Sequence, residues 1–294
     1  MLDLQNIYSI RSGVQEMSEA RGSEIRDFDK RFCFRSFGVT VGVESGDPVL
    51  LEKAREVVLK AFGGRAQIFE EPSAETGHRF GIEFRDGEFV LYKNGHGTSC
   101  GASERNFFRY LNSLLRLEVG EFAEGCVFVH AGVVGWNGRA IMFPGISSSG
   151  KSTLTAELIR NGATYYSDEY AVLEADGRVS SFPRHLSLRY FGGTRLREVP
   201  PQELGAEVGR NAIPVGMVLV TSFSKGAKWD PEVLSAGSGI MEIIPNTLTM
   251  LRDPAFSLKV LDLVAQHAIM VKSPRGDAKK FAKFLLEFFD NHSK

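Results

Sequence analysis

The first part of the chain alternates apolar and polar residues in a way that predicts a small mixed sheet with two helices. Val39, Val41 and Val43 are separated by Thr40 and Gly42, which is the period of a half-buried strand. The predicted elements are a strand over 39–43, a helix over 48–62, a hairpin over 80–92 and a helix over 103–118. We therefore expect a small α+β domain over 36–122, preceded by a lead-in segment over 1–35.

Longer apolar runs dominate the second part. Val215 to Val220 is continuously apolar, as in a strand that is buried on both faces. Further predicted strands cover 126–134, 140–143, 163–166 and 268–271, with a hairpin over 170–182, and predicted helices cover 152–161, 257–266 and 277–289. Strands that alternate with helices predict an α/β fold for 123–294, with a linker near 120–125.

Composition narrows the function classes. The chain has 294 residues, 43% hydrophobic and 24% charged, with a net charge of −1. This composition is typical of globular domains and indicates no nucleic-acid partner and no membrane partner. Cys33, Cys100 and Cys126 are isolated, without metal-ligand spacing, and are typical of reduced thiols. Together with the lack of a signal-peptide pattern, they predict a cytoplasmic location.

The most specific motif lies between the strand over 140–143 and the helix that follows it. Gly145, Gly150, Lys151 and Ser152 fit the phosphate-binding pattern G-x-x-x-x-G-K-[ST] in a strand–loop–helix setting. The glycines let backbone N–H groups surround phosphate oxygens, and the helix N-terminus adds positive potential. Lysine adds a point charge, and the serine hydroxyl suits Mg²⁺. The predicted nucleotide-binding residues of this loop are Gly145, Ser147, Ser148, Ser149, Gly150, Lys151, Ser152 and Thr153.

Asp168 and Glu169 are the candidate acids. They follow the short strand after the loop's helix, and ligands gather at the carboxyl ends of strands in such sheets. One acid can hold Mg²⁺ directly or through water, and the other can accept a proton during phosphoryl transfer. We expect Ser152, Asp168 and Glu169 to form the metal site and Asp168, Lys151 and His130 to be catalytic.

His130 and a group of arginines are further candidates. His130 ends a long apolar strand that a short turn connects to the strand of the loop, which would bring it beside the phosphates. Arginine side chains suit phosphate recognition. Among the arginines after the acidic pair, Arg184 and Arg189 are the leading candidates for nucleotide contacts.

Taken together, these motifs resemble the HPr kinase/phosphorylase family and more closely its shorter HPr-kinase-related members. The resemblance extends from Val129-His130-Ala131-Gly132 through the 145–153 loop and Leu158 to Gly162, then Ser167-Asp168-Glu169, and ends near Arg189. It implies a P-loop core of the type shared with phosphoenolpyruvate carboxykinase, ATP and Mg²⁺ as cofactors, Asp168 as the catalytic acid/base and His130 near the phosphates. It also suggests a homo-oligomer.

The resemblance does not identify the phosphoryl acceptor. Family members carry a Pro-x-x-Pro-Gly-Arg-Asn loop that contacts HPr, whereas this chain has Ser273-Pro274-Arg275-Gly276-Asp277. The acceptor hydroxyl therefore belongs to a protein serine, a peptide or a small molecule, and the preference for ATP or GTP stays open. The leading hypothesis is a kinase; the alternative is a nucleotide-responsive binding module without transfer. A carboxykinase-like enzyme and a GTPase fit less well, because the corresponding metal-binding and base-reading motifs are not found.

Overall fold

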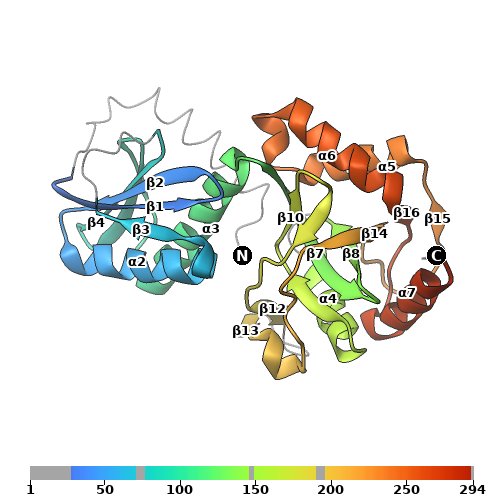
Figure 1. Cartoon of the computed structure of the whole chain (residues 1–294). Coiled ribbons are helices and arrows are strands. Elements are labelled where there is room, and N and C mark those ends of the chain that lie inside the picture. The colour runs from blue at the N-terminus through green and yellow to red at the C-terminus, as the bar shows by residue number, and fades with distance from the viewer. Residues whose placement is uncertain (1–27, 71–76, 146–148, 190–195, 293–294) are drawn as a thin grey trace. The chain divides into compact units, whose positions relative to one another are not determined.

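The computed structural model describes residues 28–70, 77–145, 149–189 and 196–292 (Figure 1). The fold is of the mixed α/β kind, with several sheets and helices. The chain divides into two compact units, with the boundary between Glu124 and Gly125. Each unit is described by itself below.

The first unit is built on a sheet with the strand order β3-β1-β2-β4-β5-β6. Neighbouring strands are antiparallel except β2 and β4, which are parallel. Helices α2 and α3 pack against each other and against the sheet. The described elements are β1 (Lys30–Ser36), β2 (Val39–Ser45), α2 (Pro48–Phe62), β3 (Gln67–Phe69), β4 (Arg79–Arg85), β5 (Glu88–Lys93), β6 (His96–Ser99) and α3 (Glu104–Phe122).

Strand β1 lies inside the range expected to be a lead-in segment, so that prediction extends too far. Phe32, Cys33 and Phe34 are fully buried, which means that both faces of the strand are covered and no apolar–polar alternation marks it. The remaining lead-in residues, 1–27, lie outside the described part of the chain. The predicted strand at 39–43, both helices and the 80–92 hairpin are confirmed.

The second unit contains a larger sheet with the strand order β11-β10-β7-β8-β14-β16-β15. Strands β8, β14 and β16 are mutually parallel, whereas β7 is antiparallel to β8. Its described elements are β7 (Cys126–Trp136), β8 (Arg139–Pro144), α4 (Lys151–Arg160), β9 (Thr164–Ser167), β10 (Tyr170–Glu174), β11 (Arg178–Ser180), β12 (Leu186–Arg189), β13 (Leu196–Val199), β14 (Ile213–Val220), β15 (Glu232–Val233), α5 (Ala236–Ile243), α6 (Pro254–His267), β16 (Ile269–Lys272) and α7 (Ala278–His292).

Helices cover both faces of this sheet, with α4 and α7 on one side and α5 and α6 on the other (Figure 1). The alternation within β8 shows the two layers: Ile141 packs in the same cluster as Leu154 of α4 and Phe281 of α7, whereas Met142 packs with Val260 of α6. Because both faces are buried, β8 and β14 read as continuous apolar runs in the sequence.

Strands β9 and β10 follow the same edge of β7 and are interrupted at Asp168 and Glu169. Val133 of β7 pairs with Ser167 of β9, and His130 pairs with Tyr170 of β10. The other edge of β7 pairs with β8, ending at Ala131 opposite Pro144. Interruptions of this kind redirect side chains and are common beside functional sites. The two acids therefore lie across β7 from the end of β8.

Most predicted elements of the second unit are confirmed, but α5 and the β12–β13 hairpin were not predicted. Helix α5 begins with Ala-Gly-Ser-Gly, and glycine is a poor helix former, so the sequence gives little sign of it. Among the residues described, the helices are too short or too polar to cross a lipid bilayer.

Candidate functional site

The 145–153 segment connects the carboxyl end of β8 to helix α4. Gly150 has φ +87°, a left-handed conformation that glycine adopts without strain, and it lets the chain turn into the helix at Lys151. Gly145 donates its backbone N–H to the carbonyl of His130 at 3.1 Å, which fixes the start of the loop on β7. The predicted contacts of Ser147 and Ser148 lie outside the described residues.

The side chain of Lys151 reaches back to Gly145, where the segment begins. Its Nζ donates to the carbonyl oxygen of Gly145 at 2.7 Å, and the residue is only 9% exposed. A buried ammonium requires acceptors or negative charge nearby. Lys151 interacts electrostatically with Asp168 and lies close enough to His130 to disfavour a positive charge on its ring.

Asp168 contacts the first turns of α4. Its Oδ1 accepts a hydrogen bond from the Thr155 hydroxyl at 3.1 Å, and its carboxylate is also hydrogen-bonded to the side chain of Ser152. The residue is 8% exposed. The acid that the sequence predicts and the helix that follows the loop are thus joined directly.

Burial raises the pKa of Asp168 to about 6, because desolvation disfavours the carboxylate. Hydrogen bonds from Ser152 and Thr155 and the charges of Arg184 and Lys151 act in the opposite direction and offset part of this effect. A carboxyl group with such a pKa changes its protonation state close to neutral pH, which suits proton transfer.

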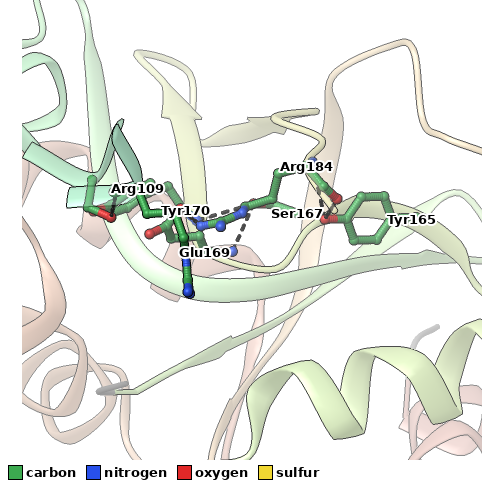
Figure 2. Close-up of polar contacts among 7 residues, drawn as sticks. Arg109, Tyr165, Ser167, Glu169, Tyr170 and Arg184 are labelled. Carbon is green, nitrogen blue, oxygen red and sulfur yellow. Dashed lines mark hydrogen bonds and ion pairs between the residues drawn. The ribbon is translucent and has the colours of Figure 1, made fainter. Parts of the chain in front are cut away.

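Glu169 points to a different partner. It forms an ion pair with Arg184, and the hydroxyl of Tyr165 donates to the carbonyl oxygen of Arg184 at 2.8 Å (Figure 2). Burial alone would lower the pKa of Arg184, but the charges of Glu169 and Asp168 raise it above its usual range. Arg184 is therefore a fixed cation between the two acids.

His130 lies in the middle of β7 (Cys126–Trp136), between the loop and the acids, and not at the end of a strand as the sequence predicted. Its backbone accepts from Gly145 on one side and pairs with Tyr170 on the other. The ring is buried, and its Nδ1 has no hydrogen-bond partner. Burial, aided by the positive charge of Lys151, lowers the pKa of His130 to about 3, so the imidazole is neutral at pH 7.

Arg275 contacts the 145–153 segment from the β14–β16 side of the sheet. It was not among the site residues that the sequence predicted. It follows β16, and its Nη2 donates to the carbonyl oxygen of Ser149 at 2.8 Å. It also lines a narrow recess beside Lys151 together with Thr221, which follows β14. The sequence did contain a signal for Arg275 and Thr221. Both follow predicted strands, and the carboxyl ends of parallel strands meet at one edge of a sheet.

Unpartnered polar atoms gather around this segment. Among the described residues of the second unit, the buried side-chain atoms without a hydrogen bond are Nδ1 of His130, Oγ1 of Thr221 and Nε of Arg275. Each flanks the 145–153 segment. Unsatisfied buried groups are costly and few in folded proteins, so a group of them indicates a place where a ligand supplies the missing partners.

The structure thus brings together most of the predicted residues, but not all of them. Lys151, Ser152, Asp168, Glu169, Arg184 and His130 form one electrostatic network. Ser149 is held by Arg275, and Thr153 is exposed at the start of α4. Arg189 ends β12, in a separate two-stranded sheet, and its side chain lies outside the described part.

A magnesium ion fits the oxygen atoms of this network better than a softer metal does. Ser152 and Asp168 offer a hydroxyl and a carboxylate, and Mg²⁺ prefers oxygen ligands and usually takes only one or two from protein carboxylates. Within the described ranges, no cluster of three or more His, Cys, Asp or Glu side chains is arranged to hold a metal by itself. Further ligands would have to come from water or substrate.

No known protein-family model matches the chain, and no curated protein matches it. A solved structure, the HPr(Ser) kinase/phosphatase from Coxiella burnetii, is similar to it over 56% of this chain and 95% of that chain. The sequence identity is 14% and the TM-score is 0.32. At that TM-score the similarity establishes neither a shared fold nor a shared activity.

Proposed function

We propose that the chain is an ATP- and Mg²⁺-dependent kinase that transfers the γ-phosphoryl group to a hydroxyl acceptor, a serine of a protein or peptide in the first instance. The second unit acts as a P-loop core that binds the triphosphate at the 145–153 segment. The observation that carries this proposal is the hydrogen bonding of Asp168 to Ser152 and Thr155, which joins a buried acid to the helix that the loop opens.

Asp168 is the proton acceptor in this proposal. Its pKa of about 6 leaves it ionised at neutral pH yet basic enough to accept a proton from an attacking hydroxyl. The acceptor oxygen forms a bond to the γ-phosphorus, the bond from that phosphorus to the bridging oxygen breaks, and ADP leaves. The hydroxyl proton moves to a carboxylate oxygen of Asp168.

The cations of the site stabilise the charge on the transferred group. Lys151 now donates to Gly145, a contact that a phosphate oxygen can replace. Arg184 is held beside Asp168 by Glu169 and presents a second fixed charge. Positive groups that are already oriented for the transferred phosphoryl group contribute most of the rate in phosphoryl transfer. The ring of His130 is neutral at pH 7, and it places an uncharged nitrogen beside these two cations.

Magnesium would be held by the Ser152 hydroxyl with Asp168 nearby, and when bound it neutralises phosphate charge. Glu169 was expected to share this role. Its ion pair with Arg184 favours a different one, in which Glu169 orients the arginine.

The proposal is tested by incubating the purified chain with γ-labelled ATP, Mg²⁺ and a host extract and identifying the labelled species by mass spectrometry. We expect a labelled acceptor with the unaltered chain and a loss of about 10²- to 10⁴-fold in transfer rate with Asp168→Asn, the usual contribution of a general base. Undiminished transfer by that variant would exclude Asp168 as the base.

A nucleotide-responsive module without transfer is the alternative. The same assay separates the two functions, because such a module binds ATP tightly, shows no turnover and labels nothing in the extract.

Thr247→Val is a suitable control variant for Asp168→Asn. It changes a buried hydroxyl of the second unit that bonds only to the carbonyl of Ile243 in the contacts described.

A further inference from the structure

Phe223 stands out among the exposed aromatic residues. It follows β14 and is 60% exposed. A single exposed phenylalanine is ordinary on a protein surface. Phe223, however, pairs with Arg275 in a parallel bridge, and the Arg275 guanidinium lies 5.8 Å from its ring centroid. Since that guanidinium also donates to Ser149, one side chain connects the exposed ring to the 145–153 segment.

The loop that carries Phe223 is firmly held. Arg275 donates its backbone N–H to Ser222 at 2.9 Å, and Ser224 donates to Arg275 at 2.8 Å. At the far end of the loop, the Asp230 backbone donates to the Ser273 hydroxyl, and Trp229 packs edge-on against Phe281 of α7. A ring on such a loop loses little conformational freedom when a ligand binds to it.

The strand order indicates which part of a nucleotide lies here. In the strand order β10-β7-β8-β14-β16, Asp168, the proposed proton acceptor, and His130 belong to the β7 and β10 side of β8. Phe223 and Arg275 belong to the β14 and β16 side. If phosphoryl transfer takes place beside Asp168, the rest of the nucleotide has to leave the loop in another direction. On the β14 side, Lys151, Thr221 and Arg275 line a narrow recess at the loop.

Charge and unsatisfied polarity agree with a nucleotide on that side. Lys225 and Lys228 are exposed on the same loop, against one exposed acid, Asp230, and the net positive charge favours an anionic ligand. The unpartnered Oγ1 of Thr221 and Nε of Arg275 belong to the same two segments as Phe223 and Arg275. An aromatic face, cations and polar atoms without partners are together what a nucleoside phosphate requires.

We propose that Phe223, supported by Arg275, is the platform on which the base of the bound nucleotide stacks. This inference rests on the proposed function and deepens it by assigning the nucleoside half of the site. Stacking on a ring uses the flat face that all bases share, so the platform binds ATP and GTP with similar affinity. The platform contributes to the affinity for the nucleotide, whereas the acceptor is selected by residues near Asp168.

The test compares Mg²⁺–ATP with Mg²⁺–tripolyphosphate, which lacks base and sugar, by titration calorimetry. For Phe223→Ala we expect ATP to bind about 5- to 100-fold more weakly, the range seen when stacking aromatics are removed, and tripolyphosphate to bind as before. We expect Phe223→Trp, which keeps an aromatic face, to bind ATP about as tightly as the unaltered chain does. Phe284→Ala is the matched control, because Phe284 is 49% exposed on α7 and contacts neither Arg275 nor the loop in the contacts described.

Other results would overturn the inference. Equal weakening of both ligands by Phe223→Ala would mean that the ring only supports the loop through Arg275. Unchanged binding of both ligands, with slower transfer to the acceptor, would assign Phe223 to the acceptor. If neither ligand bound the unaltered chain, the proposed function would fall together with the inference, an outcome distinct from the first two.

Discussion

The Thr155 hydroxyl lies 3.1 Å from Oδ1 of Asp168 and 3.0 Å from the carbonyl oxygen of Lys151. A hydroxyl has one proton to donate. It can donate to Oδ1 of Asp168 when that residue is ionised. When Asp168 is protonated and donates to Thr155, the hydroxyl can donate to the carbonyl oxygen of Lys151 instead. Thr155 can therefore serve both protonation states of the acid without leaving its place in the helix.

Thr155→Val tests this relationship. The variant keeps the shape of a fully buried side chain and removes the hydrogen bond that favours the carboxylate. We predict that the pKa of Asp168 rises by about 0.5 to 1 unit and that the rising limb of the transfer rate against pH moves upward with it. We also predict a loss of about 1 kcal/mol in the free energy of unfolding.

The control for this prediction is Thr247→Val. Thr247 is also buried, and its hydroxyl donates to the carbonyl four residues earlier at 3.1 Å, as Thr155 does. Its loss of stability is expected to be similar, with an unchanged pH profile. If both variants left the profile where it was, Thr155 would have no influence on the acid.

Asp168→Asn is predicted to stabilise the chain while it inactivates it. The pKa of Asp168 is about 6 in the fold against an ordinary 3.8, so between these values the folded chain binds more protons than the unfolded chain. The group therefore lowers stability as pH rises through that interval. At pH 7.5 the asparagine variant should gain up to about 3 kcal/mol in the free energy of unfolding.

The gain in Asp168→Asn should shrink as pH falls below 6 and vanish below 3.8, where the aspartate is protonated in both states. Urea denaturation at pH 7.5 and at pH 3.5 measures the difference directly. A stability difference of the same size at both pH values would show that the carboxyl group has no raised pKa.

Glu169→Gln distinguishes a metal ligand from a residue that orients Arg184. Because Glu169 is ion-paired with Arg184, we predict that the variant lowers kcat and leaves the Mg²⁺ concentration for half-maximal rate unchanged. Arg184→Lys should lower kcat in the same way, since lysine lacks the planar fork of donors. A clear rise in the Mg²⁺ requirement with Glu169→Gln would instead make Glu169 a ligand of the ion.

Gly150→Ala is predicted to weaken nucleotide binding through the loop. The added Cβ would lie 2.2 Å from Nη2 of Arg275, and φ at this position is +87°, so both the backbone and the contact with Ser149 are disturbed. A strained residue of this kind costs about 1–3 kcal/mol, and we expect at least about tenfold weaker ATP binding.

Gly162→Ala is the matched comparison for Gly150→Ala. Gly162 also has a positive φ, +96°, at the other end of α4, but its nearest neighbour, Trp136, lies 3.7 Å from the added Cβ. This variant should lose stability and keep its ATP affinity in calorimetry. Equal affinity losses in both variants would indicate a general effect of helix strain.

The strand–loop–helix pattern around residues 145–153 could be predicted because short-range chemistry determines it. Apolar β8, the glycines and the end of α4 at Asn161 and Gly162 all lie where the sequence predicts them. Asp168 could be predicted on the same basis, since it follows a strand directly. Strand β7 was predicted, but its position between β9 and β8 could not be, because strand order depends on long-range pairing.

The contributions of Arg275 and Phe223 also depend on long-range pairing. Both follow strands that were predicted, yet only the parallel pairing of β14 with β8 and β16 brings them to the loop. The ion pair between Glu169 and Arg184 is similar, because neighbouring acids in a sequence give no indication of which one turns toward the helix.

The most direct measurement for the central claim, that the 145–153 segment holds a triphosphate, is the dissociation constant of Mg²⁺–ATP for the unaltered chain and for Lys151→Met. The substitution retains most of the length of the side chain of a residue that is 9% exposed and removes its charge. We predict that ATP binds the variant about 10- to 100-fold more weakly, as expected for lost hydrogen bonds to a charged group. Equal affinity of both chains, with both folded, would contradict triphosphate binding at this segment.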